Sequence, residues 1–165
     1  EVSGVMVDPL VVSIPYVPFR VPTQLSTRNP VRYVDLSPNG DISHLGFAKA
    51  NPFFRRRLVD SAIAQLRWDG YIASREAMGT QLGNEWWKIN PESKFTYTVQ
   101  FTWSRPGKLP DPDNRAASLK HLVDGIALAI SINDSRMTLA DSVEIVRVPK
   151  NQSAEATVLT LREVP

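Results

Sequence analysis

Aspartates that could bind a metal or take part in catalysis are concentrated in a short stretch of the second half of the chain. Asp111 and Asp113 are separated by one proline, and in an extended segment two such side chains point to the same side. Carboxylate oxygens are ligands that Mg²⁺ prefers, and one or two protein carboxylates are enough to hold it. The pair therefore predicts a magnesium site. Aspartate and proline are also ordinary turn and N-cap residues, so a structural role is the alternative.

The residues that follow this pair are spaced as on a helix. Lys120 lies seven residues after Asp113 and Asp124 lies four residues further, so at 3.6 residues per turn the three share one stripe. A lysine aligned between carboxylates could neutralise negative charge that develops on a phosphate. The alternative is a surface Lys–Asp pair, worth only about 0.2–0.5 kcal/mol.

A third carboxylate follows this helix. Asn133 and Asp134 stand where the chain turns back, and both residue types favour turns. Together, three carboxylates and a lysine within 24 residues suit the metal-dependent hydrolysis of a phosphodiester. In such a site the metal polarises a phosphoryl oxygen and lowers the pKa of a bound water.

These residues, in this order, resemble the RusA family of Holliday junction resolvases. The resemblance covers residues 105–148, is looser over 10–67 and is absent from 71–93. The matching positions are the Asp-Pro-Asp-Asn segment 111–114, Leu119-Lys120, Val123-Asp124-Gly125-Ile126, Asn133-Asp134, and upstream the segment 25–29 and His44.

The resemblance implies an α+β fold in which a small mixed or antiparallel sheet packs with two main helices, in a homodimer. It implies a Mg²⁺-dependent endodeoxyribonuclease, with Mn²⁺ as a possible substitute, that resolves Holliday junctions or other branched DNA during recombination and repair. It also implies a cytoplasmic, nucleoid-associated protein of a bacterial or phage-infected cell.

The resemblance also assigns roles to individual residues. Asp111, Asp113 and Asp134 match the metal-binding carboxylates, and Lys120 matches the active-site lysine. The spacing from Asp113 to Lys120 is that of longer-spaced phage members, and Asn133 replaces the first Asp of a pair. Supporting positions around these ligands would be Asn114, Asp124 and Asn133.

Basic residues near these segments are candidate phosphate contacts, which give affinity without sequence information. Arg105 and Lys108 are the stronger candidates because they flank the acidic motif; a solvated surface is the alternative for each. For Trp86-Trp87, packing in a core or a dimer is favoured over base stacking, and Trp103 is expected in the core. The full candidate set is Arg28, Arg32, Lys49, Arg55, Arg56, Arg57, Arg105 and Lys108.

Composition excludes several other classes of protein. The chain of 165 residues has no Cys and two His, which excludes thiol catalysis and disulfide scaffolds and disfavours zinc sites. No apolar run approaches the roughly 18 residues of a membrane span, and residues 1–10 do not resemble a secretory signal. The first 110 residues hold an excess of basic residues and the remainder an acidic excess, which suits a polyanion ligand or is ordinary scatter.

The elements that must position the site follow from hydrophobic periodicity and breakers. Residues 1–165 are expected to form a single domain, in which 1–50 supply a strand and a Pro-rich loop and 105–148 the acidic core. Two alternative functions stay open: a nuclease that cuts flaps, and a non-catalytic DNA-binding or assembly protein with the same fold. The expected elements are an edge strand at 10–17, a loop over 18–50, a helix from Asn51 to about Gly70, a strand at 95–103, a helix over 114–130, and a hairpin of strands 142–148 and 157–164.

Overall fold

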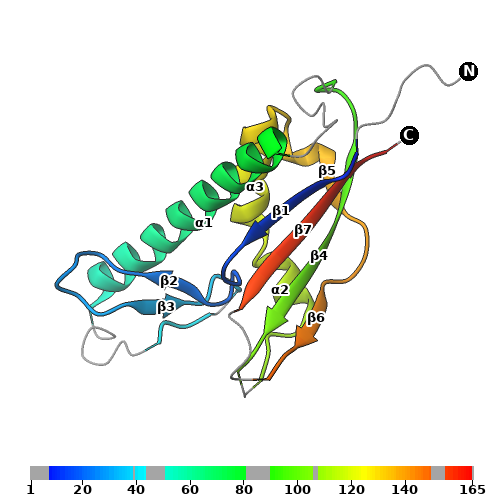
Figure 1. Ribbon diagram of the computed structural model, residues 1–165. Coiled ribbons are helices and arrows are strands. Elements are labelled where there is room, and N and C mark those ends of the chain that lie inside the picture. The colour runs from blue at the N-terminus through cyan, green and yellow to red at the C-terminus, as the bar shows by residue number, and fades with distance from the viewer. Residues whose placement is uncertain are drawn as a thin grey trace, which may run out of the picture.

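A mixed five-stranded sheet forms the centre of the computed structural model (Figure 1). The structure describes residues 8–38, 40–43, 51–80, 90–105, 108–149 and 155–164. Together with two main helices, the mixed sheet confirms the α+β class. The strand order is β1-β7-β4-β5, with β6 also paired to β4. The strands are β1 (Leu10–Ile14), β4 (Phe95–Trp103), β5 (Met137–Leu139), β6 (Glu144–Arg147) and β7 (Ala156–Glu163).

Strand β4 has the alternation that its sequence predicts. Phe95, Val99, Phe101 and Trp103 are buried, and Tyr97 is half-buried on the same side. Because alternate side chains of a strand face opposite sides, this row joins the core that covers one face of the sheet. Trp103 is therefore a core residue, as expected.

The prediction of a hairpin between the last two strands is wrong. β7 pairs antiparallel with β4 over its whole length, whereas β6 pairs parallel with β4 on the opposite edge. The two strands therefore lie on either side of β4 and do not touch each other. Strand β5, also parallel to β4, lies within a segment in which no strand was expected.

The Pro-rich segment is more regular than the expected loop. Within it, β2 (Val21–Thr23) and β3 (Arg32–Val34) pair antiparallel as a small separate sheet. Val21 and Val34 are buried in the main core. The expectation failed because Pro22 is tolerated in so short a ladder. The edge position of β1, paired only with β7, agrees with the sequence prediction.

Helix α1 (Pro52–Thr80) begins where predicted and ends ten residues later than predicted. The side-chain oxygen of Asn51 accepts hydrogen bonds from the Phe53 and Phe54 amides at 3.0 and 3.2 Å, which is N-cap geometry. Gly70 does not end the helix. A Cβ there would lie 2.8 Å from Leu122 Cδ1, so the glycine allows a second helix to approach closely.

The predicted helix over 114–130 is two helices, α2 (Pro112–Ala117) and α3 (Lys120–Ile130). Its apolar stripe is buried as expected, and α3 packs against α1 (Figure 1). At Gly125 the approach is closest, because a Cβ there would lie 2.1 Å from the Arg67 carbonyl oxygen. The Asp-Gly step thus has a packing function.

Among the described residues, none of the helices combines the length and the apolar character that crossing a bilayer requires.

Candidate functional site

Asp111 is the N-cap of α2. Its Oδ1 accepts a hydrogen bond from the Asn114 amide at 2.9 Å, and Pro112 follows as the first helical residue. Asp111 therefore has the N-cap role that the sequence analysis gave as the alternative to metal binding. Oδ2 has no hydrogen-bond or ion-pair partner among the described residues, so this oxygen stays available to a ligand.

Asp113 lies in the first turn of α2 and its side chain is exposed. The expected extended Asp-x-Asp segment is wrong, because only Asp111 is extended and the chain is helical from Pro112 onward. Residues two apart at a helix start do not face each other. The two carboxylates therefore do not project in parallel.

Asp134 lies at the other end of α3, in the short 3-10 helix η3 (Asp134–Arg136). Asn133 caps it by accepting the Ser135 amide at 2.9 Å, which is a turn role. α3 has 11 residues and therefore separates Asp134 from α2 by about 16 Å along its axis. Among the residues that the structure describes, no three His, Asp or Glu side chains lie close enough to hold one metal.

Lys120 and Asp124 form an i,i+4 ion pair on α3. Lys120 Nζ lies 3.5 Å from Asp124 Oδ2, and Arg67 of α1 lies 3.9 Å from the same oxygen. Asp113 does not extend this stripe as predicted, because the helix is interrupted at Ser118-Leu119. The lysine side chain remains 69% exposed, so a phosphate could still reach it.

His121 lies beside this charge cluster. Burial lowers its pKa, and the positive charges of Arg67 and Lys120 lower it further, against a raising effect from Asp124. Its Nδ1 is buried without a hydrogen-bond partner among the described residues. The imidazole is therefore held in its neutral form near neutral pH.

Three of the predicted DNA contacts form ion pairs. The pairs of Arg55 and Arg56 are with exposed carboxylates, and such pairs contribute roughly 0–1 kcal/mol, whereas the Glu155 side chain paired with Arg105 is only 15% exposed. The pairs are Arg55–Asp41 at 3.2 Å, Arg56–Asp60 at 3.3 Å and Arg105–Glu155 at 2.7 Å.

The other basic candidates differ in exposure. Arg28, Arg57 and Lys108 are exposed, whereas Arg32 is half-buried, with its guanidinium 5.6 Å from the centre of the Phe54 ring. The remaining positions named from sequence, His44, Lys49 and Trp86-Trp87, lie outside the described residues.

A cleft of about 370 Å³ opens beside the N-cap of α2. It joins the start of α2 to the segment after β3, which was expected to belong to the Pro-rich loop over 18–50. Its walls hold a lysine, an amide and two carboxylates. The polar lining residues are Asp35, Ser37, Lys108, Asp111 and Asn114.

Two further carboxylates were passed over by sequence reasoning. Asp35 lines the cleft, and no local pattern connects it with Asp111, 76 residues later. Asp141 is exposed in the turn that precedes β6. It follows Asp134 by seven residues, on the other side of β5, and is a second carboxylate downstream of the acidic motif.

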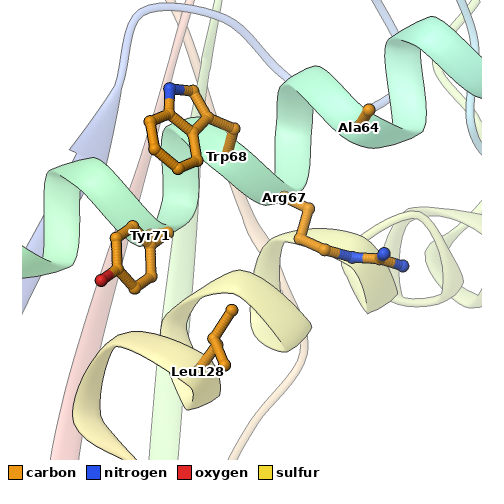
Figure 2. A pocket seen from close by; sticks show the side chains of 5 residues that line it. All are labelled: Ala64, Arg67, Trp68, Tyr71 and Leu128. Atoms are coloured by element: carbon orange, nitrogen blue, oxygen red, sulfur yellow. The ribbon is translucent and has the colours of Figure 1, made fainter.

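An apolar hollow of about 460 Å³ lies between α1 and α3. Trp68 and Tyr71 of α1 stack with ring centres 5.6 Å apart, and Leu128 of α3 faces them (Figure 2). Trp68 is 60% and Leu128 65% exposed. Large apolar side chains grouped at the surface in this way are typical of interaction sites.

Comparison with family models and with curated proteins finds no match to this chain.

Proposed function

We propose that this chain is a divalent-metal-dependent endodeoxyribonuclease of RusA-like type that cuts Holliday junctions or other branched DNA in the cytoplasm of a bacterial or phage-infected cell. The order of the acidic motif, the lysine and the Asp-Gly step carries the proposal. These residues lie on the consecutive helices α2 and α3. The cleft beside Asp111, with Lys108 in its wall, supports it.

The donor set of α2 fits a hard divalent cation. Mg²⁺ keeps several waters and takes one or two protein carboxylates together with substrate phosphates, and Asp111 can provide one through Oδ2. Asp113, which does not project beside Asp111, stays a predicted ligand. Asp134 does not gather with them within the described residues of one subunit, so its role as a ligand stays a prediction. When bound, such a cation would polarise the scissile phosphate and acidify a water.

The residues of the chain itself perform the remaining functions. The hydrogen bond from the Asn114 amide to Oδ1 orients the Asp111 side chain, and Oδ2 would bind the cation. Lys108 in the cleft would bind a strand phosphate, and Arg105, three residues earlier in the chain, would extend the basic surface. Lys120 would move from Asp124 to neutralise charge as it grows on the phosphate, an interaction stronger in the transition state than in the ground state.

A homodimer belongs to this proposal. A four-way junction has two-fold symmetry, and an isologous dimer would present two equivalent sites to symmetric strands. We place the dimer contact at the apolar hollow of Trp68, Tyr71 and Leu128 (Figure 2). A second copy is the occupant because paired cleavage requires two copies of the chain.

The second candidate is a non-catalytic DNA-binding or assembly protein with the same fold. The observation in its favour is that the three carboxylates do not form one cluster among the described residues. Such a protein would bind branched DNA without needing a metal.

Cleavage of labelled four-way junction, flap and linear duplex, with and without Mg²⁺, separates the two candidates. We expect Mg²⁺-dependent paired nicks in the junction. Asp111→Asn and Asp113→Asn should abolish cleavage and leave binding largely intact, since each removes charge that attracts the cation. Asp134→Asn and Asp141→Asn identify the downstream carboxylate. Junction binding without cleavage by the parent chain in Mg²⁺ or Mn²⁺ would establish the second candidate instead.

A further inference from the structure

Two arginines meet at one carboxylate where β4 ends and β7 begins. Arg105 Nε donates a hydrogen bond to Glu155 Oε1 at 2.7 Å, and Arg20 Nη1 lies 3.9 Å from the same oxygen. Arg20 lies between β1 and β2, so the three residues come from distant parts of the chain. Because two cations face one anion, the cluster carries an excess of one positive charge.

An aromatic ring, and not a hydrogen bond, positions the guanidinium of Arg20. The guanidinium lies 3.4 Å from the centre of the Tyr33 ring, a stacking contact that suits its planar and weakly hydrated charge. At 3.9 Å the contact with Glu155 is an ion pair but too long for a hydrogen bond. Among the described residues no group accepts a hydrogen bond from this guanidinium, and none of its nitrogens is a fully buried atom without a partner. Its N–H donors are therefore open to a ligand.

Arg105 also keeps most of its donors. Its side chain is 46% exposed, and Nε makes its hydrogen bond to Glu155. A guanidinium carries five N–H donors in a planar fork that fits two oxygens of a phosphate. Two such forks that share one carboxylate oxygen are poorly satisfied, and a phosphate between them would accept from both.

The cluster adjoins the cleft beside the N-cap of α2. Arg20 and Tyr33 line a hollow of about 290 Å³, and Asp35 lies in its wall. Asp35 also lines the cleft, so the two cavities adjoin. Asp41, the other carboxylate of this hollow, is paired with Arg55 at 3.2 Å, which offsets its repulsion of a phosphate. A DNA strand with one phosphate in the cleft would bring a neighbouring phosphate to Arg20.

We infer that Arg20 and Arg105 form a clamp for a backbone phosphate of the bound DNA strand, and that Glu155 occupies this clamp in the absence of DNA. This inference rests on the proposed binding of branched DNA. Glu155 holds the two guanidinium groups near each other, so the phosphate has less to order when it binds. Its negative charge also competes with the phosphate, so it weakens the binding of DNA.

Anisotropy titrations of a labelled four-way junction with the full chain, in EDTA and at several NaCl concentrations, test the clamp without using activity. Arg20→Gln should raise the Kd about tenfold, as the loss of one charged hydrogen bond does. It should also reduce the slope of log Kd against log salt by about one, the value of one phosphate contact. Arg20→Lys should keep the slope but not the full affinity, because an ammonium group cannot stack on Tyr33 as a plane. Arg162→Gln, an exposed position near the other end of β7, is the control and should change neither value.

Glu155→Gln separates a phosphate clamp from a purely structural ion cluster. Its amide oxygen can still accept the hydrogen bond from Arg105, whereas the competing charge is gone. The junction should bind about fivefold more tightly, the effect of removing one like charge about 4 Å from a phosphate in water. Glu163→Gln is the matched control, because Glu163 lies eight residues further along the chain at the end of β7, about 26 Å away. Its Kd should stay within about twofold, since this separation exceeds the screening length of about 10 Å at 0.1 M salt.

Junction affinity that is unchanged or weaker in Glu155→Gln would overturn the clamp, because the cluster would then serve only the fold. A parental salt slope in Arg20→Gln would overturn it as well and leave the proposed nuclease intact. If thermal unfolding shows that Arg20→Gln is destabilised, Arg20→Lys and Glu155→Gln decide the question. A parent chain that binds the junction but does not cut it in Mg²⁺ would overturn the nuclease alone, since the same affinities judge the clamp. A parent chain that binds no branched DNA would overturn both.

Discussion

A single aspartate can hold a helix in place and still keep an oxygen for chemistry. Asp111 caps α2 through Oδ1, and asparagine is an equally good N-cap residue. Replacement by Asn therefore separates the charge from the cap, whereas replacement by Ala would cost about 1 kcal/mol of stability as well. This is why amide variants are the informative ones at this site.

Lys120 tests whether the ion pair on α3 also serves catalysis. Lys120→Ala should lower the cleavage rate at saturating junction by more than it weakens binding, because the proposed contact strengthens in the transition state. Lys120→Arg should not restore the full rate, since a guanidinium is a planar fork and not a compact charge. Single-turnover cleavage and binding titrations measure the two effects.

Equal losses of affinity and rate would instead make Lys120 an ordinary phosphate contact. Arg56→Ala is a suitable comparison, because Arg56 is also paired i,i+4 with a carboxylate but lies on α1. It should weaken binding slightly and leave the single-turnover rate at saturating junction unchanged.

At the scale of elements, the contact between α1 and α3 depends on glycine. Gly125→Ala would place a Cβ 2.1 Å from the Arg67 carbonyl oxygen, and forcing such an approach costs about 1–3 kcal/mol. We expect urea unfolding to show this loss although alanine is the better helix former. Because α3 carries Lys120 and Asp124, cleavage should fall with stability.

Gly79→Ala provides the control for helix propensity. Gly79 lies near the end of α1, and no atom stands within 4 Å of an added Cβ. The substitution should stabilise the chain by about 0.4–1 kcal/mol. Equal effects of the two substitutions would contradict the close helix packing.

The pH dependence of stability should report His121. Its pKa in the folded chain lies below the ordinary value of 6.5, so the unfolded chain takes up the proton first as pH falls. The contribution of the neutral imidazole to the free energy of unfolding is therefore fully present above pH 6.5. It is lost as the pH falls from there through the pKa of His121 in the folded chain. His121→Gln should make the unfolding free energy flatter between about pH 7 and pH 5.5. If His121→Gln leaves the pH dependence of the unfolding free energy unchanged, the pKa of His121 is not lowered in the folded chain.

At the scale of the whole molecule, the proposed function requires two copies of the chain. Sedimentation at micromolar concentration should give about twice the 18.4 kDa chain mass without DNA, with the two acidic regions on one shared face. Trp68→Glu should convert the dimer to monomer, since a carboxylate would be buried in the apolar hollow.

Phe53→Glu is the matched control for the dimer. Phe53 is also on α1 and is 82% exposed, but it lies outside the hollow, so the dimer should persist. A chain that remains monomeric both alone and on a junction would contradict the dimer and the paired mechanism together.

Elements whose pattern is local could be predicted from the residues alone. The alternation of β4, the cap at Asn51 and the apolar stripe of α3 each follow from which face of one segment is buried. The spacing of apolar residues within one segment predicts which of its faces is buried. The α+β class followed from the resemblance to a known family, and the acidic motif from residue type alone.

Contacts between segments far apart in the chain became known from the folded structure and not from the sequence. It placed β6 and β7 on opposite sides of β4, and it set Gly70 and Gly125 at a helix contact and not at a helix end. It also brought Asp35 to the cleft of Asp111. None of these has a local signal, because strand pairing and helix approach are set by packing between distant residues and not by the spacing within one segment.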